Sequence, residues 1–121
     1  MHLGRRNRRQ YLKVRDQTRA LVRSRIAHFN AVYKFRVGRI FIKNHKSRWG
    51  SCSEAGNLNF NYKLLYLPSE ISDYIIVHEL CHIGQFDHSP AFWKLVERTV
   101  PEHKNLRRRL RRLERGEGEE L

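Results

Sequence analysis

The chain has few of the residues that mark a secreted or membrane protein. It contains only two cysteines, Cys52 and Cys81, and neither belongs to a CxxC pair. A disulfide framework is therefore excluded, and a reducing compartment is the simplest setting. No apolar run reaches membrane-spanning length, and the charged N-terminus lacks the apolar segment of a secretory signal. We expect a soluble, cytoplasmic protein, and 121 residues suffice for one domain.

Acidic residues are also scarce, because 12 Asp and Glu oppose 25 Lys and Arg and leave a formal charge of +13. The excess lies at the ends of the chain. The first 25 residues hold nine basic and one acidic side chain, and residues 101–115 hold seven and two. Such a field attracts polyanions without any base-reading contact. The basic termini are therefore either solvated helix faces or a non-specific nucleic-acid contact surface, and the sequence leaves both open.

Hydrophobic periodicity predicts the elements of the N-terminal half. Apolar residues recur at three- and four-residue steps from about residue 5 to 29, which predicts an amphipathic helix that ends near Asn30. Residues 34–43 alternate polar and apolar side chains around Gly38 and predict one or two short strands. The turn cluster at 54–57 separates two further strand-like runs and predicts a hairpin.

Three helices are predicted in the C-terminal half. The first covers about residues 70–84 with Ser69 as its N-cap, and it is apolar on nearly all sides, which is typical of a helix in the centre of a domain. Ser89 begins the second helix, and Pro101 opens the third, in which leucines form an apolar stripe. The predicted fold class is α+β, with a small antiparallel sheet packed on the central helix, one helix before it and two after it.

The central helix carries the sequence HELCH at residues 78–82. His78 and His82 are four residues apart, so both side chains lie on one helix face, about 6 Å apart along the axis. Both imidazoles therefore reach one metal ion at about 2.0–2.1 Å. Glu79 lies to the side of the pair, where it is placed to contact a water on the metal as a general base. Two polar rings on a buried helix cost free energy unless they are bonded, and metal ligation supplies that bond.

A catalytic zinc ion takes three protein ligands and leaves its fourth position to water. His88 is the expected third ligand, because Gly84 allows the chain to turn back toward the ion. Three neutral imidazoles leave the zinc its full charge, which lowers the pKa of the bound water toward about 7. Glu79 then takes a proton as this water attacks a polarised carbonyl or phosphoryl group. We expect one zinc ion per chain, although nickel, cobalt and iron also suit histidine ligands.

Longer strings around this motif resemble those of a known family. KSRWGSCS, HELCH and HSPAFW together resemble the YgjP-like metal-dependent hydrolases, also described as SprT-like or zincin-type metallopeptidases, over about residues 19–110. The resemblance implies zinc at the three histidines, Glu79 as catalytic base, and a last sheet strand, within 51–62, that borders the substrate cleft. It matches only the C-terminal catalytic part of typical members, so we expect either a naturally minimal member or a fragment. Residues 1–115 are then one zincin-like catalytic domain, and 116–121 are an acidic, flexible tail.

The sequence leaves three functions open. A zinc metallopeptidase that acts on peptides or proteins is favoured by the resemblance. A metal-activated water would also serve the hydrolysis of a nucleotide phosphoanhydride. A nucleic-acid-binding module with a structural zinc is the alternative without catalysis. Glu79 argues against that module, because a structural site needs no carboxylate beside its ligands and is usually closed by a fourth protein ligand.

Other side chains near these motifs have two interpretations. Arg48 and Trp49 either line the cleft or anchor an edge strand. Cys81 is expected to be a small buried apolar residue, and Cys52 is either that or an inhibitory metal ligand. The remaining candidates are Tyr62, Tyr66 and Tyr74, which either stabilise an oxyanion or pack in the core, and His2, His28, His45 and His103, which are expected to be exposed or structural.

Overall fold

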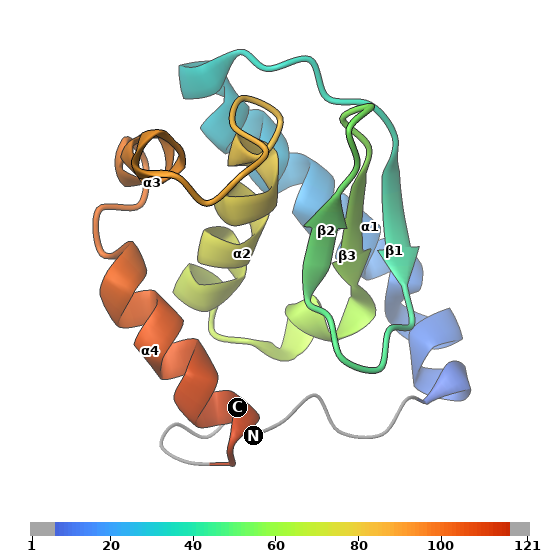
Figure 1. Ribbon diagram of the computed structural model, residues 1–121. Coiled ribbons are helices and arrows are strands. Elements are labelled where there is room, and N and C mark those ends of the chain that lie inside the picture. Colours follow the sequence, from blue (N-terminus) through green and yellow to red (C-terminus); the bar gives the residue numbers. More distant parts are fainter. Residues whose placement is uncertain (1–6, 117–121) are drawn as a thin grey trace.

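Four helices and a three-stranded sheet make up the fold, which confirms the α+β prediction (Figure 1). The structure is a computed structural model, and it describes residues 7–116. The elements follow in the order α1 (Arg8–Tyr33), β1 (Ile40–Lys43), β2 (Gly50–Cys52), β3 (Leu58–Asn61), a 3-10 helix (Tyr62–Tyr66), α2 (Ser69–Cys81), α3 (Pro90–Glu97) and α4 (His103–Glu114). No helix within the described residues is long and apolar enough to cross a membrane.

Helix α1 lies behind the sheet and α2 in the view of Figure 1. Its buried stripe keeps the predicted spacing, but the helix continues past Asn30 to Tyr33. The Asn30 side chain instead stabilises the turn that follows the helix, because its amide accepts a hydrogen bond from Phe35 N at 2.8 Å and donates one to Phe35 O at 2.9 Å. Lys34 turns the chain with φ of 60°, in the left-handed region. The buried positions of α1 are Val14, Thr18, Val22, Ile26, Phe29 and Tyr33.

The sheet has the strand order β1-β3-β2 and is mixed. β2 and β3 form the predicted antiparallel hairpin, and Gly56 occupies its turn with φ of 84°. β1 pairs parallel with β3, so the prediction of a wholly antiparallel sheet is wrong for that pair. Strand direction depends on how a connection crosses the domain, which alternation of side chains does not encode. β3 is the central strand, and its Leu58 and Phe60 are fully buried.

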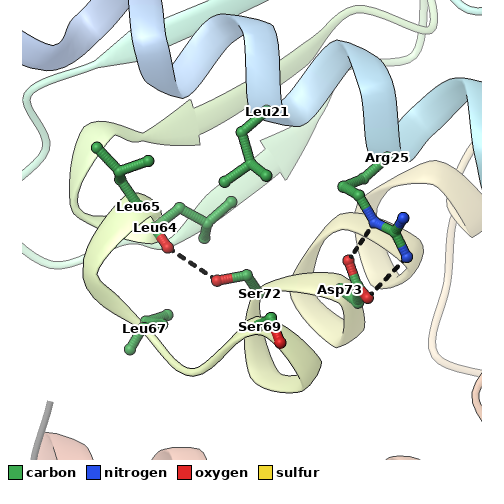
Figure 2. Close-up of a pocket in the computed structure, with 8 residues that line it drawn as sticks. All are labelled: Leu21, Arg25, Leu64, Leu65, Leu67, Ser69, Ser72 and Asp73. Atoms are coloured by element: carbon green, nitrogen blue, oxygen red, sulfur yellow. Dashed lines mark hydrogen bonds and ion pairs between the residues drawn. The ribbon is translucent and has the colours of Figure 1, made fainter.

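Helix α2 occupies the centre of the molecule, as its apolar surface predicts. Ser69 does not cap it, because Pro68 is the N-cap residue and no side chain caps the first turn. The start of α2 is held by tertiary contacts (Figure 2): Ser72 Oγ donates to Leu64 O at 2.8 Å, and Arg25 of α1 pairs with both carboxylate oxygens of Asp73 at 2.9 and 3.0 Å. These contacts border a hollow of about 490 Å³ with leucine walls.

Helices α3 and α4 pack on the side of α2 opposite β2 (Figure 1). Ser89 caps α3 as predicted, since its Oγ accepts from Phe92 N at 3.3 Å and Pro90 is the first helical residue. α4 begins at His103 rather than at Pro101, which lies in the preceding turn. Its leucine stripe is buried. Residues 117–121 of the predicted tail lie outside the described part of the chain.

Candidate metal centre

The three histidines of the motif meet at the C-terminal end of α2. His82 is the C-cap residue, and its φ of −65° and ψ of −19° keep it on the helical path above His78. The Nε2 atom of His88 lies 3.2 Å from Nε2 of His82 and 3.2 Å from Nε2 of His78. Two ligands that are bound tetrahedrally at about 2.05 Å from a zinc ion lie about 3.3 Å apart. The spacing of the imidazole nitrogens therefore fits a tetrahedral metal ion.

Hydrogen bonds at the other ring nitrogens fix which nitrogen faces the site. His82 Nδ1 lies 3.0 Å from Gln85 O, and a carbonyl only accepts, so Nδ1 carries the proton. His78 Nδ1 lies 3.3 Å from Glu79 Oε2, and it likewise donates to the carboxylate oxygen. Both Nε2 atoms consequently present lone pairs toward Nε2 of His88. Imidazole nitrogens that converge with free lone pairs suit a bound cation.

Phe92 of α3 holds the three imidazoles in place. Its fully buried ring stacks on His82 at a centroid distance of 4.3 Å, and it meets the rings of His78 and His88 edge-on at 5.1 and 5.2 Å. Burial lowers the pKa of His88, as do the neighbouring charges of His78 and His82, so the ring favours its neutral form. The neutral form is the one that binds a metal ion.

Glu79 lies beside the ligand set, where β2 comes closest to α2. The residue is only 7% exposed. A Cβ atom on Gly50 would lie 3.0 Å from Glu79 Cγ and 3.3 Å from Oε2, so only glycine leaves this carboxylate its present position. The cleft has a volume of about 430 Å³. Besides Glu79 and the three histidines, it is lined by Arg48, Gly50, Ser51, Cys52 and Phe86.

The structure assigns a different one of the two interpretations, cleft lining and strand anchoring, to Arg48 and to Trp49. Arg48 is exposed and lines the cleft, whereas Trp49 is buried and donates from Nε1 to Glu114 Oε1 at 3.0 Å. Cys52 lines the cleft and is half-buried, and burial and the nearby Glu79 charge raise its pKa to about 11. Cys81 is fully buried, as expected. β2 thus borders the cleft, whereas β3, the last strand along the chain and the one that lies wholly within 51–62, does not line it.

The tyrosine candidates do not line the cleft. Tyr62 is fully buried and donates to Gln10 Oε1 at 3.1 Å, and Tyr66 is exposed outside the cleft. Tyr74 is 5% exposed and packs edge-on against His78 at 6.0 Å. Among the other histidines, His28 is exposed, His45 is half-buried, His103 is buried with a structural role, and His2 lies outside the described residues.

Sequence reasoning missed three parts of the centre. The carbonyl of Gln85 has no side-chain signature, because every residue carries that group. The ring of Phe92 is fully buried, and sequence spacing alone does not place it against the imidazoles. The role of Gly50 could have been predicted in part, because a glycine inside a strand often marks a place where another group approaches the backbone closely. The partner in that approach is 29 positions away, so its identity required the structure.

Comparison with known proteins places this chain in a wider group. A family model described as "YgjP-like, metallopeptidase domain" matches residues 4–113. The chain is similar to the solved metallopeptidase zymogen of Pyrococcus abyssi abylysin, with 25% identity, a TM-score of 0.67, and coverage of 74% of this chain and 90% of that chain. It shares its fold with the metallopeptidase zymogen of Methanocaldococcus jannaschii jannalysin, with 22% identity, a TM-score of 0.60, and coverage of 77% and 92%. No curated protein sequence gives a significant match.

Proposed function

The chain belongs to the YgjP-like metallopeptidase domain family, and on that basis we propose that it is a zinc-dependent peptidase. In this proposal His78, His82 and His88 hold one zinc ion, and Glu79 is the general base. The observation that carries the proposal is the convergence of three imidazole nitrogens, all within 4.8 Å of one another, beside a nearly buried carboxylate. Converging imidazole nitrogens suit a metal ion, and a carboxylate beside the ligands is the group that a hydrolytic site needs in addition to the metal.

When bound, zinc supplies a Lewis acid that polarises a carbonyl group and lowers the pKa of water. The residues of the chain supply the proton acceptor, the orientation of the ligands and the charge in the cleft. Glu79 accepts a proton within the cleft, and the Gln85 carbonyl keeps His82 in the tautomer that binds metal. Arg48 adds a positive charge to the cleft, which suits the negative charge that develops on a carbonyl oxygen.

β2 supports a peptide substrate over a smaller one. In the described part of the chain it pairs only with β3, so its other edge is available to an extended backbone. All three of its residues line the cleft. A peptide that adds to this edge would bring a scissile carbonyl group beside the histidines, which is the positioning that a peptidase requires.

The two alternative functions, nucleotide hydrolysis and nucleic-acid binding with a structural zinc, gain no support. Neither the family match nor the similar structures favour hydrolysis of a nucleotide or binding to nucleic acid. A structural zinc site would usually be closed by a fourth protein ligand. Within residues 7–116, the converging donor group contains only the three histidines.

Two variants test the proposal. Glu79→Gln keeps the shape of the side chain and removes its basicity, so zinc content should stay near one ion per chain while kcat falls about 100- to 10,000-fold. His82→Ala should lose both zinc and activity, because it removes a ligand. Zinc is measured by elemental analysis, and hydrolysis is measured on casein and a peptide library. Wild-type turnover by Glu79→Gln would exclude Glu79 as the base, and a zinc-loaded wild-type protein that cleaves no peptide would exclude the peptidase function.

A further inference from the structure

A third cavity, of about 400 Å³, lies between α3 and α4. Its walls combine aromatic rings with charged groups, and it is separate from the cleft that holds the histidines. Trp93 and His103 form the aromatic part, because their rings stack at a centroid distance of 5.0 Å with an interplanar angle of 18°. Lys94 and Glu97 of α3 and Lys104 and Arg107 of α4 supply the charged groups.

Trp93 connects this cavity to the metal centre. Its ring centroid lies 5.9 Å from that of His78 and 6.1 Å from that of His88, so one indole is shared between the cavity and the ligand set. An extended peptide advances about 3.3 Å per residue. Two or three such residues span about 7–10 Å, which exceeds the distance from these imidazoles to the indole.

The cations of the cavity have no carboxylate partner among the described residues. Within residues 7–116, no carboxylate lies within 4.0 Å of Lys94, Lys104 or Arg107. Glu97, the acidic group among the described lining residues, lies 3.9 Å from Nε2 of His103 instead. The cavity consequently carries an excess of positive charge.

Arg107 is exposed and lies over the Trp93 ring at the wall of the cavity. Its guanidinium carbon lies 5.7 Å from the centroid of the Trp93 ring, which is cation–π distance. A guanidinium that is fixed on an aromatic ring presents its donors in a planar fork, and this fork matches the two oxygens of a carboxylate. The half-buried indole beside it excludes some water, which strengthens the attraction between charges.

We propose that this cavity is a substrate subsite that accepts a glutamate or aspartate side chain of the peptide, with Arg107 as the principal carboxylate-binding group. The inference rests on the proposed peptidase function, since it names the substrate class of that site. Trp93 supplies the apolar wall for the methylene groups of the side chain, and Lys94 and Lys104 add to the positive potential. A lysine or arginine side chain is disfavoured there by the same charges.

Binding to the zinc-loaded Glu79→Gln variant tests the subsite without turnover. The probes are fluorescent nonapeptides with acetylated and amidated ends, so that only side chains carry charge. In each, a single Glu, Gln or Lys moves through successive positions. At one position, the Glu peptide should bind about 10-fold more tightly than the Gln peptide, and the Lys peptide should bind more weakly than both. Equal affinities at every position would overturn the proposal.

Charge reversal on α4 separates the subsite from the general basic field of the protein. Arg107→Glu should abolish the preference for Glu, because two lysines then face two carboxylates, and Arg107→Gln should weaken it. Arg108→Glu is the matched control, because this neighbour is exposed, makes the same change in net charge and does not line the cavity. It should keep the Glu preference. Equal losses in Arg107→Glu and Arg108→Glu, with both variants folded by circular dichroism, would assign the preference to net charge and overturn the subsite.

Hydrolysis of the same peptides by the wild-type protein distinguishes the two proposals. Cleavage that favours Glu at the position found by binding supports both. Cleavage without any preference for Glu overturns the subsite and leaves the peptidase function intact. A preference for Glu in binding, without cleavage of any peptide, overturns the peptidase function and keeps the carboxylate site.

Discussion

Gly50 offers a test of whether Glu79 acts from a fixed position. In Gly50→Ala, the new Cβ would lie 3.0 Å from Glu79 Cγ and 3.0 Å from Asn59 O. Non-bonded carbon atoms prefer separations of about 3.5–4.0 Å. Asn59 lies in the central strand β3, so its carbonyl cannot move without disturbing the sheet. The Glu79 side chain is the partner that yields, and it must move by about 0.5 Å to restore contact distance.

The size of the effect follows from this displacement. A shift of about 1 Å in a reacting group can cost about 100-fold in rate. Half that shift corresponds to about 10-fold, or about 1.4 kcal/mol in the activation free energy. The free energy of unfolding should change by less than about 1 kcal/mol, because alanine reduces the entropy of the unfolded chain and so opposes the cost of crowding. In Gly50→Ala we therefore expect a clear loss of rate with little change in the free energy of unfolding.

The assay measures kcat and KM on a cleaved peptide, zinc content and urea unfolding for wild type, Gly50→Ala and Gly50→Val. We expect kcat to fall about 10-fold in the alanine variant and further in the valine variant. Zinc content should not change in the alanine variant, because the three histidines do not contact residue 50. A wild-type kcat in Gly50→Ala, or a loss of kcat that only follows loss of zinc or of folded protein, would refute the positioning argument.

Three further outcomes are expected. Gly84→Ala should reduce the free energy of unfolding by about 1–3 kcal/mol in urea titrations, because its Cβ would lie 2.6 Å from a ring carbon of Phe35; wild-type stability would contradict the close contact. Asp73→Ala should cost about 0.5–1 kcal/mol through loss of the bidentate pair with Arg25, and a deficit that persists undiminished in 1 M salt would contradict an ionic origin. In zinc-free protein, Cys52 should react slowly with iodoacetamide at pH 8 and faster as the pH rises toward its pKa of about 11, whereas fast labelling at pH 8 would contradict a protonated thiol.

Much of the fold was predictable because its elements are amphipathic on a local scale. The α1 stripe, the hairpin and the buried α2 all follow from the spacing of apolar residues. The boundaries were less accurate where a tertiary contact decides them. Asn30 is a typical stop residue, yet the helix continues because its side chain pairs with the backbone of Phe35 beyond the turn. Ser69 is a typical cap, yet it is the first residue of α2, whose N-cap residue is Pro68, and the first turn is held by the bond from Ser72 to Leu64.

The candidate centre divides in the same way between local and distant determinants. The ligand set lies within 11 residues, where helical spacing and one turn fix the positions of His78, His82 and His88, so the sequence predicts it without the fold. What surrounds that set comes from β2, α3 and α4, whose approach to α2 depends on packing across the whole domain. A histidine motif therefore predicts that a metal can bind, whereas the position of Glu79 and the proposed carboxylate subsite depend on contacts such as Gly50 on Glu79 and Arg107 on Trp93. Relatives that share the motif are consequently expected to differ in substrate wherever these outer contacts differ, since the chemistry and its specificity are held by different elements.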